Sequence, residues 1–142
     1  MPLAESCFRL NERGIDIAAL RRALEHPHCG AVVGFDGVVR DHHGGRAVSA
    51  LRYEAYAELA EREGQAIVDE ALTKFAVRRI VAEHRVGLLA IGEVAVFVGV
   101  AAAHRDAAFA ACRHVIDAIK SRVPIWKHEH YADGAAEWIH PD

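Results

Sequence analysis

The sequence predicts an α+β fold, because strand-like and helix-like segments follow one another without regular alternation. Residues 30–40 and 93–103 are almost continuously apolar and rich in β-branched side chains, which is typical of buried strands. Residues 58–75 and 104–123 instead repeat apolar side chains at helical spacing. This order predicts a mixed or antiparallel sheet with a C-terminal hairpin, rather than the parallel sheet of a repeating strand–helix pattern.

The N-terminal third is expected to contain one short helix and one buried strand. Asp16 can cap a helix in the segment IDIAALRRAL, which ends at His26-Pro27. In the strand that follows, Gly37 predicts a bulge or a close approach of another chain segment. The next segment, DHHGGR at residues 41–46, is expected to be a mobile glycine-rich loop that closes over an anionic ligand through Arg46 and its histidines.

The middle of the chain predicts two alternating strands around a helix. LRYEAY, residues 51–56, alternates as a half-buried strand, and the helix from about Glu58 to Phe75 follows it. Residues 78–87 alternate again, and GLLAIGE, residues 87–93, is expected to form a turn.

The C-terminal third predicts a helix and then a hairpin. The helix at residues 104–123 should end before Pro124, because the residue preceding a proline avoids the helical region. Residues 124–131 and 135–140 are expected to pair around a turn at Asp133-Gly134.

Length and composition fit one globular domain over residues 1–142. Hydrophobic residues make up 52% of the 142 positions, enough to bury a substantial core. The formal charge is −3, from 17 Lys and Arg against 20 Asp and Glu. We therefore expect neither nucleic acid nor a membrane as partner, and any anion-binding site must be local.

The cysteines and the chain start favour a cytoplasmic location. Cys7, Cys29 and Cys112 are odd in number and widely spaced, so neither a disulfide framework nor a cysteine zinc site is indicated. The start lacks a basic region followed by a long apolar stretch, and no apolar run approaches the ~20 residues of a membrane helix. No metal and no cofactor are expected.

The stretch IKSRVPIWKHEH, residues 119–130, concentrates positive charge around a proline. It could be a solvated basic segment after a helix, or an anion-binding site in which partly desolvated Lys120 and Lys127 act as acid, base or nucleophile. A metal site at His128 and His130 with Glu129 is a weaker interpretation, because spacing fixes no third ligand.

A second candidate for anion binding lies at the start of the last helix. His104 and Arg105 would add an imidazole and a guanidinium to the free N–H groups of the helix N-terminus, although a plain surface pair is the alternative. Lys120 lies at the other end of that helix, roughly 22 Å away at 1.5 Å per residue. The two clusters can share one small ligand only if the helix assignment is wrong or a second subunit contributes, and we expect an oligomer.

The order of several motifs resembles a known family, the molybdopterin synthase catalytic (large) subunit. The motifs are FDGVVR (35–40), LRYEAY (51–56), EHRVGLLAIGE (83–93), VFVGVAAAHR (96–105) and IKSRVPIWKHE (119–129). Together they cover nearly the whole chain. Val38 and Ala102 depart from the family pattern, which often has a polar or basic residue and a serine there.

The resemblance implies an α/β-hammerhead domain that forms a homodimer and binds two copies of a small ubiquitin-like subunit, giving a heterotetramer. The C-terminal Gly-Gly of that partner, activated as a thiocarboxylate, delivers sulfur to cyclic pyranopterin monophosphate, and two transfers make the dithiolene of molybdopterin. This chain ends in HPD, so the sulfur donor is expected to arrive on another chain.

The resemblance also implies site residues. Lys120 and Lys127 are expected to be catalytic. The residues expected to bind the substrate are Val39, Arg40, His104, Arg105, Lys120, Lys127, His128 and Glu129. Two other functions are considered: a non-catalytic module that docks a ubiquitin-like tail, and a lysine-dependent Schiff-base enzyme acting on a carbonyl metabolite.

Overall fold

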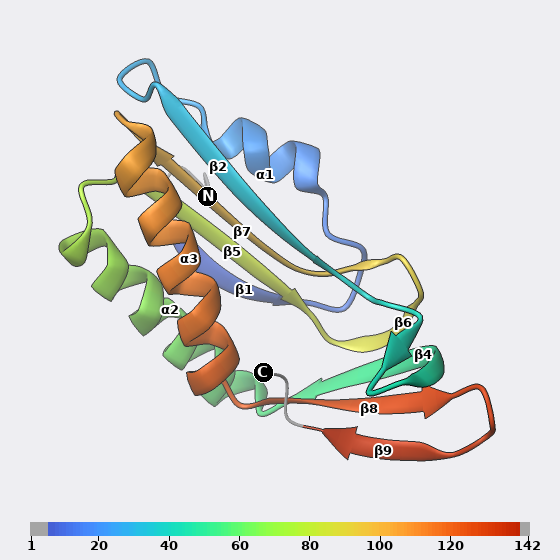
Figure 1. Ribbon diagram of the computed structural model, residues 1–142. Coiled ribbons are helices and arrows are strands. Elements are labelled where there is room, and N and C mark those ends of the chain that lie inside the picture. Colours follow the sequence, from blue (N-terminus) through green and yellow to red (C-terminus); the bar gives the residue numbers. More distant parts are fainter. Residues whose placement is uncertain (1–5, 140–142) are drawn as a thin grey trace.

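The computed structural model describes residues 6–139, in which three helices pack against two β-sheets (Figure 1). In chain order the elements are β1 (Cys7–Asn11), α1 (Ile17–Leu24), β2 (Ala31–Val38), β3 (His42–His43), β4 (Arg46–Ala55), α2 (Ala57–Lys74), β5 (Arg79–Arg85), β6 (Gly87–Ala90), β7 (Val94–Ala102), α3 (Arg105–Arg122), β8 (Ile125–Tyr131) and β9 (Ala136–Ile139). The predicted α+β class and the C-terminal hairpin are confirmed; the last residue predicted for the hairpin, His140, lies outside the described residues.

The larger sheet has the strand order β1-β5-β7-β2 and is mixed. β1 runs parallel to β5, whereas β5 and β2 run antiparallel to β7. α2 and α3 cover one face, and α1 covers the other (Figure 1). β7 is therefore buried on both faces, which explains its uninterrupted apolar sequence.

The main core lies between this sheet and the helices α2 and α3, and it continues into the second sheet. Ile67 of α2 and Val115 of α3 are fully buried in the same cluster as Leu51, Leu89 and Ile125 of the second sheet. α1 closes a smaller cluster on the opposite face through Leu20 and Leu24. Its predicted cap is confirmed, because the Asp16 carboxylate accepts a hydrogen bond from the Ala19 amide at 3.0 Å.

The second sheet has the order β3-β4-β8-β9, and β6 also pairs with β4. The prediction of a turn over residues 87–93 is therefore wrong for its first half. Gly87 adopts a φ of +98°, which ends β5 and redirects the chain so that residues 87–90 pair with β4. The turn itself is confined to the residues around Gly92, which has a φ of +89°.

The segment DHHGGR is a hairpin rather than the open loop that was predicted. Gly44 and Gly45 both have positive φ, 56° and 79°, as a two-residue hairpin turn requires, and they join β3 to β4. Arg46 pairs with Asp133 and Glu137, and its guanidinium lies 3.6 Å from the centre of the Tyr131 ring. Arg46 is thus bound to the carboxylates of the β8–β9 hairpin and is not among the residues that line the cavity described below.

β2 contains the irregularity that Gly37 predicted. The pairing with β7 shifts between Gly37 and Val38, and a Cβ on Gly37 would lie only 2.6 Å from a methyl group of Val96. The bulge ends regular pairing just before Val39 and Arg40. The chain can then leave the larger sheet and run toward the second one.

Candidate functional site

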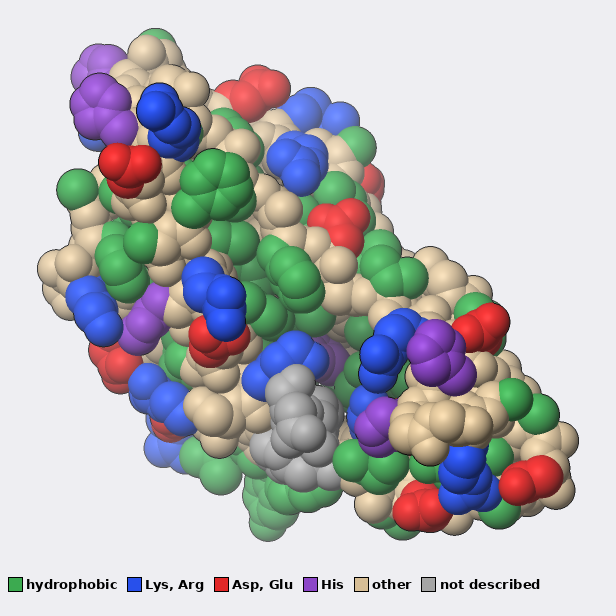
Figure 2. Space-filling model, viewed as in Figure 1, with side chains coloured by type: hydrophobic (Ala, Val, Ile, Leu, Met, Phe, Trp, Pro, Cys, Tyr) green, Lys and Arg blue, Asp and Glu red, His purple; other side chains and the backbone are tan. Residues whose placement is uncertain are grey.

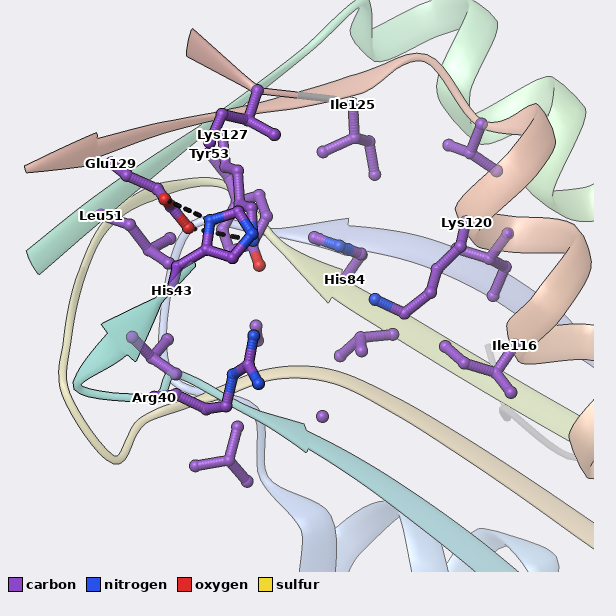
Figure 3. Close-up of a pocket in the computed structure, with 18 of the residues that line it drawn as sticks. Arg40, His43, Leu51, Tyr53, His84, Ile116, Lys120, Ile125, Lys127 and Glu129 are labelled. Atoms are coloured by element: carbon purple, nitrogen blue, oxygen red, sulfur yellow. Dashed lines mark hydrogen bonds and ion pairs between the residues drawn. The ribbon is translucent and has the colours of Figure 1, made fainter. Parts of the chain in front are cut away.

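A cavity of about 270 Å³ lies where the two sheets meet the last turns of α3 (Figure 3). Its polar wall contains Arg40, His43, Tyr53, His84, Lys120, Lys127 and Glu129. Its apolar wall includes Leu51, Ile116 and Ile125. Figure 2 shows Lys, Arg and His side chains around the hollow between the helical part and the smaller sheet.

Along β8, the side chains of the C-terminal motif lie alternately on the cavity side and on the opposite side of the strand. Successive side chains of a strand point to opposite faces, so Ile125, Lys127 and Glu129 face the cavity. His128 faces the other way and stacks on Trp138, with ring centres 4.4 Å apart and an interplanar angle of 7°. His128, predicted to bind the substrate, therefore does not line the cavity.

The same alternation excludes the metal site considered at His128, His130 and Glu129. The two imidazoles lie on one face of β8, with ring centres 4.7 Å apart, while the carboxylate lies on the other face. Among residues 6–139, no group of three or more His, Cys, Asp or Glu side chains is placed to hold a metal ion.

Glu129 organises one wall of the cavity. Its side chain is almost completely buried, and its carboxylate accepts hydrogen bonds from Nδ1 of His43 at 2.7 Å and from the Tyr131 hydroxyl at 2.8 Å. Its second oxygen pairs with Nζ of Lys127 at 3.1 Å. The sequence prediction placed Glu129 among the substrate-binding residues; in the structure Glu129 lines the cavity and contacts three other side chains of the same wall.

These contacts set the charges on that wall. Burial would raise the pKa of Glu129, but the hydrogen bonds from His43, Tyr131 and Lys127 lower it below its ordinary value. Lys127 is thereby paired with a fixed, buried carboxylate. Burial, together with the nearby charge of Glu129, raises the pKa of Tyr53 to about 12, so this phenol stays protonated.

Arg40 and Lys120 bring further positive charge from two other elements. Arg40 follows β2, and its position is fixed because the neighbouring Val39 donates a backbone hydrogen bond to Glu93 and accepts one from Gly92. Val39 is buried and lines the cavity as predicted. Lys120 reaches in from the last turn of α3 (Figure 3). With Lys127, three cations on three elements surround one small space, an arrangement suited to a multiply charged anion.

His84 is a cavity residue that the sequence prediction did not assign. It lies on β5 with only 5% of its surface exposed, and Nδ1 donates a hydrogen bond to the backbone carbonyl of Arg85 at 2.7 Å. Burial, together with the positive charge of Lys120, lowers the pKa of His84 to about 4. A single histidine within a buried strand has no spacing pattern that could have identified it.

His104 and Arg105 do not reach this cavity within one chain. His104 precedes α3 with an extended backbone, and both side chains are exposed at the N-terminus of the helix. Since α3 runs unbroken from Arg105 to Arg122, Lys120 lies about 22 Å from Arg105 along the helix. The distance inferred from the sequence is thus retained in the structure.

The described residues also bear on the predicted absence of a membrane segment. Within residues 6–139, no helix combines the length and the apolar character needed to cross a bilayer.

Comparisons with a family model, with related sequences and with solved structures all identify the same family. Residues 10–122 match the family model described as MoaE protein. The chain is 41% identical over 129 residues to a molybdopterin synthase catalytic subunit of Thermoplasma volcanium, covering 91% of this chain and 94% of the relative. A crystal structure of molybdopterin synthase from Staphylococcus aureus superposes with a TM-score of 0.87 at 35% identity, covering 92% of this chain and 95% of that one.

A more distant neighbour is itself part of a complex. It comes from a protein–protein complex of subunits 1 and 2 of the molybdopterin-converting factor of Helicobacter pylori. The TM-score is 0.74 at 20% identity, with 94% of this chain and 88% of that chain covered. At this identity the likeness concerns the fold.

Proposed function

This chain belongs to the MoaE family of molybdopterin synthase catalytic subunits, and from that premise we propose how its cavity works in molybdenum cofactor biosynthesis. The cavity takes cyclic pyranopterin monophosphate and, from a small ubiquitin-like partner, a C-terminal thiocarboxylate. The sulfur bonds to a carbon of the pyranopterin while a carbon–oxygen bond at the same carbon breaks, and that oxygen leaves as a phosphate oxygen or, after protonation, as water. Attack of water on the acyl carbon then breaks its bond to sulfur and leaves the partner with a carboxylate. Two such transfers make the dithiolene.

The convergence of Arg40, Lys120 and Lys127 on one cavity carries this proposal. The cyclic phosphate and the thiocarboxylate are both anions, and fixed cations in a partly apolar space attract them more strongly than cations in water would. The apolar side chains of Ile116 and Ile125 exclude water from part of the wall.

The cysteines favour a sulfur donor outside this chain. None of the residues that line the cavity is a cysteine. Burial raises the pKa of the Cys112 thiol to about 11, and it also raises the pKa of Cys7, so neither forms the reactive thiolate readily. The two-subunit complex of the Helicobacter pylori neighbour supports delivery of sulfur by a small partner subunit.

The two lysines have different surroundings, which supports different roles. Lys127 is paired with the buried carboxylate of Glu129 and is suited to hold an anionic substrate. Lys120 extends from a helix end toward the neutral His84, and we assign to it proton transfer or contact with the acyl group. Lysine suits this role because its amine can lose a proton, whereas a guanidinium stays protonated.

We also propose that the active form contains a homodimer, within a heterotetramer. His104 and Arg105 belong to the family's site motifs yet lie about 22 Å along α3 from Lys120. Large apolar side chains are exposed nearby on α3 and on the edge strand β2: Phe109 is 61% exposed, Val32 41% and Phe35 38%. Burying them against a second copy would allow its His104 and Arg105 to reach this cavity.

The assignment of roles is tested by two charge-conserving variants, Lys120→Arg and Lys127→Arg. With thiocarboxylated partner and cyclic pyranopterin monophosphate, single-turnover sulfur transfer is followed by the mass gained by the substrate. We expect Lys120→Arg to slow the chemical step at least about 100-fold with little loss of binding, and Lys127→Arg to retain more activity. Equal rates in both variants would contradict the assignment.

The same mixture distinguishes the other two functions considered. A docking module would bind the partner without adding sulfur to the substrate. A Schiff-base enzyme would be trapped by borohydride with a carbonyl compound, without any need for the thiocarboxylated partner.

A further inference from the structure

We propose that His84 is a positioning residue for Lys120: its Nε2 accepts a hydrogen bond from the Lys120 amine and thereby directs the amine lone pair into the cavity. The inference rests on the proposed role of Lys120 and extends it to a residue that contacts neither sulfur nor phosphate.

The backbone fixes which nitrogen of His84 carries the proton. Nδ1 lies 2.7 Å from the carbonyl oxygen of Arg85, and a carbonyl can only accept, so Nδ1 must donate. In the neutral imidazole, Nε2 then has no proton and offers a lone pair. Neutrality follows from burial, which disfavours the imidazolium form at physiological pH.

The ring is also held in place. The imidazole meets the Tyr53 ring edge to face, with centres 4.8 Å apart and an interplanar angle of 83°. With Nδ1 anchored to the backbone of β5 and the Tyr53 ring packed against it, the imidazole has little freedom to turn. Nε2 therefore presents its lone pair in a fixed direction.

Lys120 is the cation beside this ring. Both side chains line the cavity, and Figure 3 shows the Lys120 side chain extending from α3 toward the imidazole of His84. Burial is the main cause that lowers the pKa of His84, and the positive charge of Lys120 acts in the same direction. A neutral acceptor next to an amine stabilises one N–H direction without adding a competing cation.

This contact has a consequence for the reaction. A neutral amine has two N–H bonds and one lone pair in tetrahedral directions. If one N–H points to Nε2, the lone pair is restricted to directions away from His84, which include the cavity. A fixed acceptor restricts the directions that the amine can take, which lowers the entropy cost of reaching the reactive geometry.

Two substitutions separate this role from simple support of β5. His84→Gln can place an amide oxygen near the position of Nε2 and keep an acceptor for Lys120. His84→Asn can place its amide N–H near the position of Nδ1 and keep the donor to the Arg85 carbonyl, but it offers nothing to Lys120. Thermal unfolding of each variant first identifies conditions under which both are folded.

Two measurements then test the proposal on the full-length chain. Sulfur transfer in a single turnover should fall about 10-fold or more in His84→Asn and by less than about 3-fold in His84→Gln. Separately, the pH dependence of Lys120 acetylation by acetic anhydride, mapped by peptide mass spectrometry, should move to lower pH in His84→Asn, because its ammonium form loses an acceptor. The midpoint for Lys127 should not move.

Each outcome decides between the possibilities. If His84→Asn is as active as His84→Gln, or if the Lys120 midpoint is unchanged in both variants, His84 only supports β5 and the proposal is overturned. If the Lys120 midpoint moves as expected while Lys120→Arg transfers sulfur normally, the contact stands and the proposed role of Lys120 in catalysis fails instead.

Discussion

Glu129 shows how one residue can determine the charge of a whole cavity wall. A buried carboxylate is costly unless it is paired and hydrogen-bonded, and here His43, Tyr131 and Lys127 all contact it. The carboxylate in turn pairs with Lys127 and holds His43 of the β3–β4 hairpin against the cavity. Glu129 thus fixes the positions of the neighbouring side chains on this wall.

We predict that Glu129→Gln lowers the free energy of unfolding by about 2–4 kcal/mol, because it leaves Lys127 without its buried counter-charge. Urea unfolding at neutral pH measures the change. Glu137→Gln is the matched control, since Glu137 likewise pairs with a basic side chain, Arg46, but is exposed, and it should change stability by less than about 1 kcal/mol. Similar losses in the two variants would show that the buried network stabilises little.

The residues of the site were predictable to different degrees. Motif positions such as Arg40, Lys120 and Lys127 could be identified because the family pattern names them, and the cavity contains all three. His43 could not be connected to Glu129, because the two lie 86 positions apart and meet only through a hairpin that was expected to be a loop. Contacts of this kind depend on strand register, which the sequence does not determine alone.

The element α2 shows a glycine selected by packing. A glycine inside a helix lowers helix propensity, so Gly64 alone would be expected to weaken α2. In the structure Gly64 is buried where α2 crosses β1, and a Cβ at this position would collide with the ring of Phe8. The glycine lowers the helix propensity of α2, but it allows α2 to approach β1 closely.

We therefore predict that Gly64→Ala destabilises the protein by about 1–3 kcal/mol, although alanine favours helices, because overpacking the contact with Phe8 outweighs the gain in propensity. Thermal and urea unfolding measure the change. Gly14→Ala is the control, since a Cβ added at Gly14 would meet no atom within 4 Å and its effect should be near zero. A stabilised Gly64→Ala variant would contradict the packing argument.

Long elements were predicted more reliably than short ones. α3 and β7 were identified near their observed ends because 18 and 9 residues provide a clear pattern. β1 and β6, with 5 and 4 residues, were missed. Both are strands because of their neighbours: β1 pairs with β5, and β6 pairs with β4. The tertiary partner supplies the information that the short sequence lacks.

At the scale of the whole molecule, α3 separates the two groups of predicted site residues. Lys120 lies in the cavity, whereas His104 and Arg105 are exposed at the other end of the helix. A rigid helix cannot shorten this distance, so motif residues at both ends can serve one reaction only across two chains. The homodimer proposal therefore predicts that each active site combines residues of both copies.

Mixing two inactive variants tests this arrangement. Lys120→Ala chains and chains carrying His104→Ala with Arg105→Ala should each be nearly inactive alone. After the two are mixed and allowed to exchange subunits, half the dimers are mixed, and each mixed dimer contains one site with every wild-type residue. Sulfur transfer should then recover to about a quarter of the wild-type rate. Mixing Lys120→Ala chains with Lys127→Ala chains is the control. It should restore no sulfur transfer, because both lysines belong to one cavity of one chain. No recovery in the first mixture, despite subunit exchange shown by native mass spectrometry, would rule out a shared site.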